Sequence, residues 1–562
     1  MRGWKRPAAI MLAVIMCISL FSGCGKEKDG AEIFSLSVSV GARPNTLDPI
    51  YAELPGDQTI LTHLYENLMR YTVDADGNVL LVPGMAKSVE KDENLDGTVS
   101  YTFRLRGAKW SDGKDVKADD FVYAWRRLAD PACNSPHAEL LSVVCGYDEA
   151  RAAGDMKLLQ VTAKSDSVFA VTLNGDYDWF LTQVCTATAT LPLRQDVVKE
   201  LKALGIEAEE ELGRQRLWWE EITWLVTNGP YFAAPYGEES WLKLVPNERH
   251  YAHGEGGPEQ LLIYLADEAE TARTLYENGG LDVAWPLTEE RLAELAADEA
   301  WEGSAQLKTC AVLFNTNKEP FGDDMIRKAM GMVIDRNALS ALAGAAVRPA
   351  EGLVPAGVPE NEEGDFRTLG GAVLDNNPDD YLARCVEAKS ILSNAGYESS
   401  AVLQGLEYLY VDEGQNAAVA QALCRQWEVR LGIHVTPRAV TEKELWGALR
   451  TGSYTLAGAE LTSDINDAEG FLEDWTSSSP DNVVFYQNSA YDTLLSIVAA
   501  AEDGTARMGC LHDAETLLLT DYVVAPLFTP ETGWDAREDL TGVYRDPRGW
   551  FSFSDAERIP ET

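Results

Sequence analysis

Between about residues 311 and 461 the sequence alternates between two periodicities, and this alternation restricts the fold more than any other feature. Short segments rich in β-branched and aromatic residues alternate with longer segments that have the apolar spacing of helices (AAVAQALCRQWEVRLG, KELWGALRTG). A chain that alternates strand and helix in this way forms sheets covered by helices. We therefore expect an α/β lobe with four strands, AVLFNTN, LEYLYV, IHVTPRAV and YTLAGAEL.

The residues before 309 predict a second α/β lobe. IFSLSVSVGA and SVFAVTLNG alternate as strands do, whereas TILTHLYENLMRY and KADDFVYAWRRLAD have helical periodicity. LLIYLADEAETARTLYENGGLDVAW predicts a βαβ unit, and DDMIRKAMGMVIDRNALSALA a helix in the later lobe. The last segment, from VVAPLFTP onward, has no strand partner nearby, so we expect it to return to an earlier lobe. Two lobes with chain crossing between them form a cleft, the usual place for a ligand.

Charge and length exclude some classes of protein. A chain of 562 residues is too long for one compact core, so two or three domains are expected. Its formal charge of −43 repels nucleic acid and gives no reason to expect peripheral binding to anionic lipid.

The N-terminus predicts export. Arg2, Lys5 and Arg6 precede an apolar run from about 8 to 21, and FSGC ends at Cys24. This is the layout of a secretory signal, and FSGC resembles the bacterial lipobox, in which the cysteine carries lipid and becomes the new N-terminus. We expect a lipoprotein signal peptide at 1–23, a tether at 24–32, and a location on the extracytoplasmic face of the cell membrane, with the lipid on Cys24 as the only membrane contact. The alternative is ordinary signal cleavage, with Cys24 incidental.

The sequence lacks the motifs of common exported hydrolases. It contains no HExxH, GxSxG or P-loop motif, so we expect no catalytic residues and no cofactor. His250 and His253 lie in a Gly- and Pro-containing segment, which favours a surface turn over a metal site. Seven cysteines follow Cys24, and a Cys133–Cys145 disulfide is one pairing that an exported protein allows.

Residues 464–475, DINDAEGFLEDW, combine carboxylates with apolar residues. The spacing does not fit a calcium-binding EF-hand loop, because the sixth position is Glu469 and the twelfth is Trp475. The residues alone leave open whether Asp464 belongs to a solvated turn or receives a positive charge from a ligand.

Several segments together resemble the oligopeptide- and dipeptide-binding lipoproteins of bacterial ABC importers, which are extracellular solute-binding proteins of family 5. The resemblance rests on RPNTLDPIYA, HLYENLMRYTVDADGNVLLVPGMAKSVE, YTFRLRGAKWSDGKDVKADDFVYAWRRLADP, TNGPYF, FNTNKEPFGDDMIRKAMGMVIDRNAL, EAKSILSNAGY and WEVRLGIHV, which follow in the family's order.

The resemblance implies an α/β fold: a two-lobe clamp like that of periplasmic binding proteins, with an extra domain inserted in the first lobe. Domain I would comprise 33–70, 190–308 and 523–562, domain II 71–189, and domain III 309–522. It also implies a monomer without enzymatic activity that binds a peptide or other small solute between its lobes and docks on ABC transporter permease subunits.

The same resemblance implies the binding residues. Asp464 corresponds to the aspartate that receives the α-ammonium of a bound peptide, and a buried ammonium needs such a carboxylate. Asn228, Gly229, Pro230 and Tyr231 correspond to a segment that presents main-chain groups to an extended peptide, although Gly-Pro is also typical of a plain turn. His137 falls near an aromatic position of the ligand pocket, with the surface of domain II as the alternative.

Some positions depart from the family pattern. Leu461 and Glu442 stand where some relatives have tryptophans beside side-chain pockets, and Gly458 stands where some have a basic residue for the peptide carboxylate. The alternatives are therefore the same fold with a non-peptide solute (a nickel chelate, haem or an oligosaccharide), a receptor for peptide signals, or an exported hydrolase.

Overall fold

The structure is a computed structural model that describes residues 33–74, 79–207, 214–238, 240–254, 256–265, 268–298, 301, 303–361, 364–397, 401–463, 465–501 and 504–559. Cys24 and Asp464 both lie outside the described residues.

The first sheet gathers strands from distant parts of the chain. Its strands run in the order β21, β11, β1, β10, β9 and β8. Their bounds are Asp535–Ala536, Val283–Trp285, Ser35–Val40, Gln260–Tyr264, Trp241–Pro246 and Tyr231–Ala234. β1 is parallel to both β10 and β11, and α7 (Ala269–Glu277) connects the latter two, so the predicted βαβ unit is confirmed.

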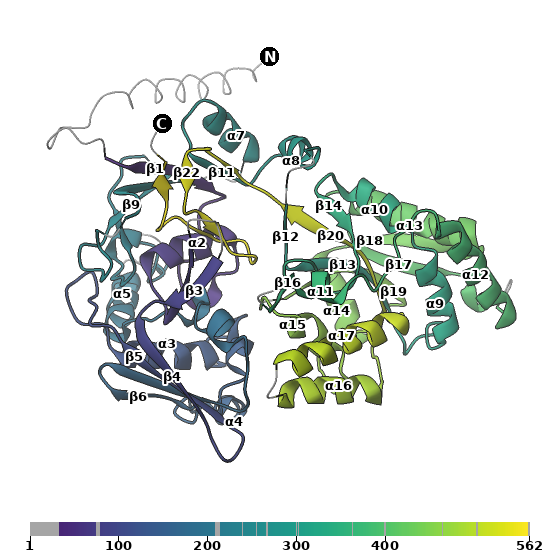
Figure 1. The fold of residues 1–562 in the computed structure, drawn as a ribbon, viewed down its shortest axis with the longest axis horizontal. Helices are drawn as coiled ribbons and strands as arrows, with labels where there is room; N and C mark the ends of the chain where they lie inside the picture. Colours follow the sequence, from purple (N-terminus) through teal and green to yellow (C-terminus); the bar gives the residue numbers. More distant parts are fainter. Residues whose placement is uncertain are drawn as a thin grey trace.

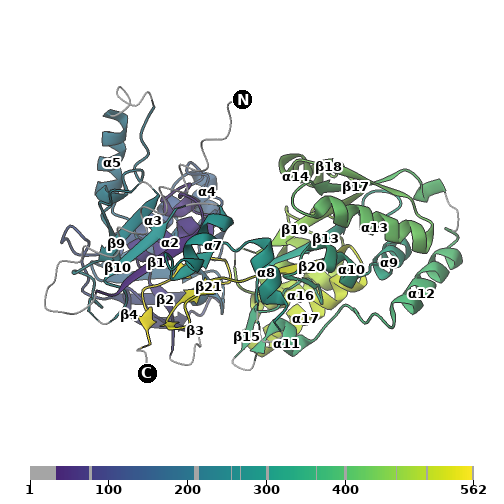
Figure 2. The same ribbon diagram turned by 90° about the horizontal axis from the view of Figure 1, so that it is seen from above.

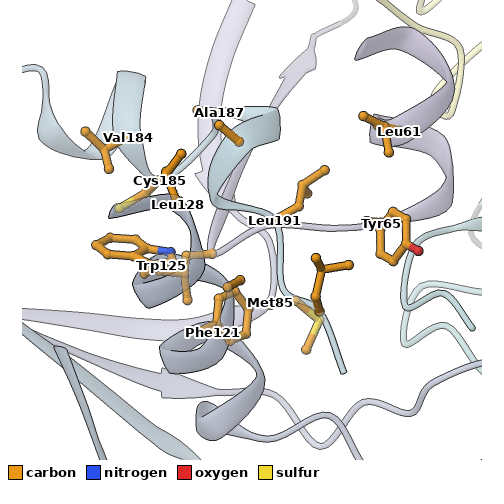
Figure 3. Close-up of a cluster of buried hydrophobic side chains, with 14 of the residues drawn as sticks. Leu61, Tyr65, Met85, Phe121, Trp125, Leu128, Val184, Cys185, Ala187 and Leu191 are labelled. Carbon is orange, nitrogen blue, oxygen red and sulfur yellow. The ribbon is translucent and has the colours of Figure 1, made fainter. Parts of the chain in front are cut away.

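A second, antiparallel sheet lies within the N-terminal third of the chain. Its order is β4 (Ala86–Glu93), β5 (Val99–Leu105), β7 (Val168–Leu173) and β6 (Val161–Ser165). Helix α3 (Ala118–Ala129) packs on β6 and β7. Figure 3 shows how Trp125 and Phe121 of α3 meet Met85, Tyr65 and Leu191 in a buried core. This core joins the first two sheets into one lobe.

The third sheet builds the other lobe. Its order is β12, β20, β13, β19, β17 and β18, with β14 paired to β20. The bounds are Ser304–Ala305, Val524–Thr532, Lys308–Phe314, Leu456–Thr462, Leu406–Val411, Val435–Val440 and, for β14, Val347–Pro349. β17, α13 (Asn416–Leu431), β18, α14 (Glu442–Thr451) and β19 follow one another as the sequence alternation predicts.

Two helix predictions needed correction. The predicted helix in 59–71 ends early: α2 is Pro55–Leu64, and Met69–Val73 form strand β2, which pairs with β3 (Val79–Pro83). The backbone leaves the helix where Glu66 exchanges two hydrogen bonds with the Asn228 side chain. The predicted helix in 323–343 is two helices, α9 (Asp324–Met332) and α10 (Arg336–Ala343), because the Asp335 side chain caps the second one.

The chain crosses between the lobes twice, at residues 304–307 and 529–532, which we call the connecting strands (Figures 1 and 2). Lobe 1 is residues 33–303 and 533–559, and lobe 2 is residues 308–528. β20 pairs with β13 of lobe 2, so the chain returns to lobe 1 after Thr532 and not at the predicted boundary of 522/523. The C-terminal hairpins do pack in lobe 1, as expected, with Phe551 and Phe553 in its core.

Two further features complete the fold. Cys133 and Cys145 are both free, so the disulfide considered from the sequence does not form, whereas Cys385 and Cys424 are buried as small apolar side chains. Among the described residues, no helix is both long enough and apolar enough to span a membrane.

Candidate ligand-binding cleft

A cavity of about 530 Å³ lies between the two lobes. This volume falls within the range of about 300–1,000 Å³ typical of small-ligand sites. Lobe 1, lobe 2 and the connecting strands all contribute to its wall, including Glu53, Gln58, His137, Trp285, Arg545, Lys308, Thr462, Ser463 and Thr532. A ligand in this cavity would therefore contact both lobes at once.

Two side chains of the lobe 1 wall converge on one carbonyl group. His137 Nε2 lies 3.1 Å from the Ala52 carbonyl oxygen, and Gln58 Nε2 donates to the same oxygen at 3.1 Å. His137 is half-buried and lies in the cavity wall. Whether it contacts a ligand or serves only as part of the surface of lobe 1 stays a prediction. Because Gln58 Nε2 faces a carbonyl, Gln58 Oε1 is the atom left to accept hydrogen bonds.

The lobe 2 wall includes Thr462 and Ser463, which precede Asp464 in the sequence. Ser463 lines the cavity, and its hydroxyl donates to the Ile465 carbonyl at 2.7 Å. Ile465 packs in the core of lobe 1, although it belongs to lobe 2 by sequence. The Asn466 N–H donates to Gln183 Oε1 of lobe 1 at 2.9 Å, and Gln183 Nε2 donates to the Asn466 carbonyl at 3.4 Å. The residues that flank Asp464 thus lie where the lobes meet.

The other carboxylates of this segment have a structural role. Asp467 and Glu469 are buried, and both accept hydrogen bonds from Arg507 of α17 (Gly504–Thr520). Burial alone would lower the pKa of Arg507, but the two carboxylates raise it above its ordinary value. Glu469 also accepts from the Trp179 indole of lobe 1 at 3.2 Å. The acidic segment is therefore partly neutralised and tied to the opposite lobe.

Residues 228–231 hold lobe 1 together. The Gly229 N–H donates to the Leu64 carbonyl at 2.9 Å, and the Gly229 and Pro230 carbonyls accept from Asn247. A Cβ on Gly229 would lie 2.5 Å from the Leu64 carbonyl carbon, so the close approach requires glycine. Asn228 is fully buried, and the Tyr231 hydroxyl donates to the Pro258 carbonyl. In this conformation the segment does not present these main-chain groups to a ligand as expected, because they already have partners.

A second cavity, of about 220 Å³, lies within lobe 2 and includes Glu442, Gly458 and Tyr408 in its wall. Thr462 lines both this cavity and the one between the lobes. A Cβ on Gly458 would lie 2.1 Å from the Tyr408 hydroxyl oxygen. Tyr408 therefore fills the space that a basic side chain at position 458 would need.

No cluster of three or more metal-ligating side chains occurs among the described residues. His250 bonds to buried Glu66, which also accepts from the Tyr251 hydroxyl. His250 is thus buried in lobe 1 at its ring, and not exposed as a surface turn would leave it.

The comparisons with known proteins agree with this geometry. The family model of the bacterial extracellular solute-binding proteins, family 5 (middle part), matches residues 81–483. The chain belongs to this family. Its members serve ABC importers as solute-binding proteins and not as enzymes, so the predicted family and the absence of enzymatic activity are confirmed.

Relatives match along most of the chain. The probable deoxycholate-binding periplasmic protein YgiS of Escherichia coli is 28% identical over 491 residues, which is 86% of each chain. The periplasmic oligopeptide-binding protein OppA of Haemophilus influenzae is 28% identical over 502 residues, 87% of each chain.

Solved structures share the fold. The unliganded open form of the murein tripeptide-binding protein MppA has a TM-score of 0.73 and 25% identity, covering 91% of this chain and 94% of that one. Haemophilus influenzae OppA in complex with the peptide RPPGFSPFR has a TM-score of 0.69 and 27% identity, covering 94% of this chain and 100% of that one. The predicted α/β two-lobe clamp is confirmed.

Sequence reasoning missed one residue of the cavity wall and two of the contacts between the lobes. Arg545 lines the cavity and lies in the C-terminal segment, which had no strand partner nearby. Gln183 and Trp179 bond to Asn466 and Glu469, and they come from a stretch for which the sequence predicted no element. The sequence around Arg545, YRDPRGWF, combines two arginines with three aromatic residues, and this combination could have indicated a polar site at Arg545.

Proposed function

We propose that this protein is the extracytoplasmic component of an ABC importer that binds peptides in the cavity between its lobes and delivers them to the permease. The observation that carries the proposal is the cavity of about 530 Å³ whose wall comes from both lobes. Its relative OppA has been solved with a peptide, and that structure covers nearly all of this chain. Rotation about the connecting strands would let the lobes close on the peptide and open to release it.

Asp464 is the proposed partner of the peptide α-ammonium. The neighbouring Ser463 lines the cavity, and Asp467 and Glu469 have Arg507 as their partner, which supports a separate role for Asp464. A charge-assisted bond at this point would fix the register of a peptide without selecting its side chains. On the opposite wall, His137 is the proposed lobe 1 contact.

We further propose that Cys24 carries the lipid that holds the protein, as a monomer, at the extracytoplasmic face of the membrane. The support is the N-terminal sequence ending in FSGC. Partition of the protein expressed in its source cell between detergent and water tests this proposal. The native protein should enter the detergent phase and Cys24→Ser should stay in water, whereas equal partition of the two would contradict it.

Isothermal titration calorimetry with a panel of di-, tri- and tetrapeptides tests the peptide assignment. Deoxycholate belongs in the panel, because the relative YgiS is named for it. Micromolar or tighter binding of at least one peptide supports the proposal. Binding of deoxycholate with no response to any peptide would replace the peptide with a bile acid as cargo.

A further inference from the structure

Arg545 occupies an unusual position in the wall of the cavity between the lobes. It ends strand β23 (Tyr544–Arg545), which pairs with β24 (Phe551–Ser552) in a C-terminal hairpin of lobe 1. Its guanidinium carbon lies 5.5 Å from the centre of the Trp285 ring and 5.4 Å from that of Phe551. Cation–π contacts of this kind hold a guanidinium in place without using its N–H groups as hydrogen-bond donors.

The guanidinium of Arg545 has no counterion among the described residues. Its Nε and Nη1 atoms are buried and have no hydrogen-bond partner there. Burial lowers the pKa of Arg545 to about 10, so the group remains cationic at neutral pH. Buried arginines are normally paired, because an unpaired buried charge is costly.

Other cations of the same wall show the usual pattern. Arg548 donates to both carboxylate oxygens of Asp546, at 2.8 and 2.9 Å. Lys308 bonds to Glu460 at 2.6 Å. Arg545 differs from both in lacking a partner, and the hairpin pairs its backbone with that of Phe551.

A second residue of the same cavity wall, Gln58, also carries an unpaired polar atom. Gln58 Oε1 is buried without a hydrogen-bond partner among the described residues, while Gln58 Nε2 is held by the Ala52 carbonyl. The cavity thus combines an unpaired cation with an unpaired acceptor. Each would gain a partner from a solute that carries an anionic group beside a hydrogen-bond donor, as a peptide end does.

We propose that Arg545 binds a carboxylate of the solute in the cavity between the lobes, with Gln58 accepting a hydrogen bond from an adjacent N–H. The proposal rests on the proposed function for the identity of that solute as a peptide. A planar guanidinium suits a carboxylate because it donates two parallel hydrogen bonds. Tyr408 fills the space that a basic side chain at position 458 would need, and Lys308 of lobe 2 is paired with Glu460, so Arg545 supplies the free cation from lobe 1.

The carboxylate has two sources, the C-terminus of a peptide or an acidic side chain. Calorimetry with Ala-Ala-Ala, Ala-Ala-Ala-amide and Ala-Glu-Ala-amide distinguishes them, using the native protein and Arg545→Met. The native protein should bind Ala-Ala-Ala about tenfold to hundredfold more tightly than its amide if the C-terminus is the source. Tighter binding of Ala-Glu-Ala-amide than of Ala-Ala-Ala-amide identifies a side chain instead.

In either case Arg545→Met should bind Ala-Ala-Ala and Ala-Glu-Ala-amide, the two peptides with a carboxylate, as weakly as it binds Ala-Ala-Ala-amide. Arg104→Met removes the same charge from an exposed pair with Glu90 in the second sheet and should keep the native preference. A native protein that does not distinguish the peptides by charge, or an Arg545→Met variant that still does, would overturn the proposal.

The effect of acetate on the melting temperature makes the test independent of peptide binding. Acetate should raise the melting temperature of the native protein above that in an equal concentration of chloride, and Arg545→Met should lose this difference. If no peptide binds, the proposed function fails, and the melting temperatures in acetate then test the role of Arg545 on their own. If acetate shifts the melting temperatures of the native protein and of Arg545→Met equally, the proposed carboxylate site at Arg545 is overturned.

Discussion

Trp179 and Glu469 form a direct hydrogen bond between the two lobes, with the indole Nε1 of Trp179 donating to Glu469 Oε2 at 3.2 Å. Both side chains are buried, and Glu469 is held at the same time by Arg507. The contact therefore links the acidic segment after Asp464 to the opposite lobe, and it favours the conformation in which the lobes touch.

Trp179→Phe should favour separation of the lobes. The variant keeps an aromatic ring but loses a hydrogen bond to a charged group, which contributes about 1.5–3 kcal/mol. The affinity for a bound peptide should fall by about tenfold to hundredfold, because binding requires the closed conformation. Calorimetry measures the affinity, and small-angle scattering the separation of the lobes.

The matched control for this change is Trp224→Phe, since Trp224 is 47% exposed and belongs to lobe 1 alone. It should leave both quantities unchanged. If Trp179→Phe also leaves them unchanged, the hydrogen bond does not contribute to closure.

Arg507→Met should destabilise lobe 2. The change leaves Asp467 and Glu469 buried without their cation, and the loss of one partner from a buried ion pair costs about 3–5 kcal/mol. Urea denaturation at pH 7.5 measures this loss. Adding Glu469→Gln should restore part of the stability, because one uncompensated charge is removed, and a double variant no more stable than Arg507→Met would contradict the electrostatic explanation.

His63 should make the stability of lobe 1 depend on pH. Its Nδ1 donates to the Thr59 carbonyl, its Nε2 accepts from the Phe553 N–H, and burial lowers its pKa to about 4. The unfolded chain takes up this proton near pH 6.5 and the folded protein only near pH 4. The contribution of His63 to the free energy of unfolding is therefore complete above pH 6.5, and it falls by about 3 kcal/mol as the pH decreases to 4.

His63→Phe removes both the two hydrogen bonds and the titration. The variant should unfold more easily at pH 7.5 and lose less stability between pH 6.5 and 4 than the native protein does. Exposed His434 provides the control, because His434→Asn should leave the pH dependence as it is. Equal pH dependence in native protein and His63→Phe would show that His63 does not carry it.

Gly458→Ala should destabilise lobe 2 by about 1–3 kcal/mol, because overpacking of a filled space strains its neighbours. The reason is the 2.1 Å approach of the added carbon to the Tyr408 hydroxyl oxygen. Gly447→Ala in α14 is the control, since a Cβ there meets nothing within 4 Å. Thermal unfolding compares the two, and equal melting temperatures would contradict the steric explanation.

Local sequence patterns were sufficient for the elements of lobe 2 from β17 to β19. The alternation through β17, α13, β18 and α14 is expressed in short-range periodicity, so the sequence predicts both the elements and their order. The end of α2 was not predictable in this way. It depends on hydrogen bonds between Glu66 and Asn228, which lie 162 residues apart.

The candidate site, too, was predictable from the sequence only in part. The role proposed for Asp464 follows from the resemblance of one segment to a known family. The bonds of Gln183 to Asn466 and the unpaired guanidinium of Arg545 arise only when distant segments fold together. Local sequence patterns do not show which distant side chains such residues will meet.

The most direct measurement compares Ala-Ala-Ala with N-acetyl-Ala-Ala-Ala by calorimetry, using the native protein and Asp464→Asn. We expect the native protein to bind the free peptide at least about tenfold more tightly than the acetylated one, because only the free peptide brings an ammonium group to the cleft. Asp464→Asn should bind both weakly and to the same extent. Equal affinity of the native protein for the two peptides would contradict the account, because Asp464 would then not receive the peptide's charge.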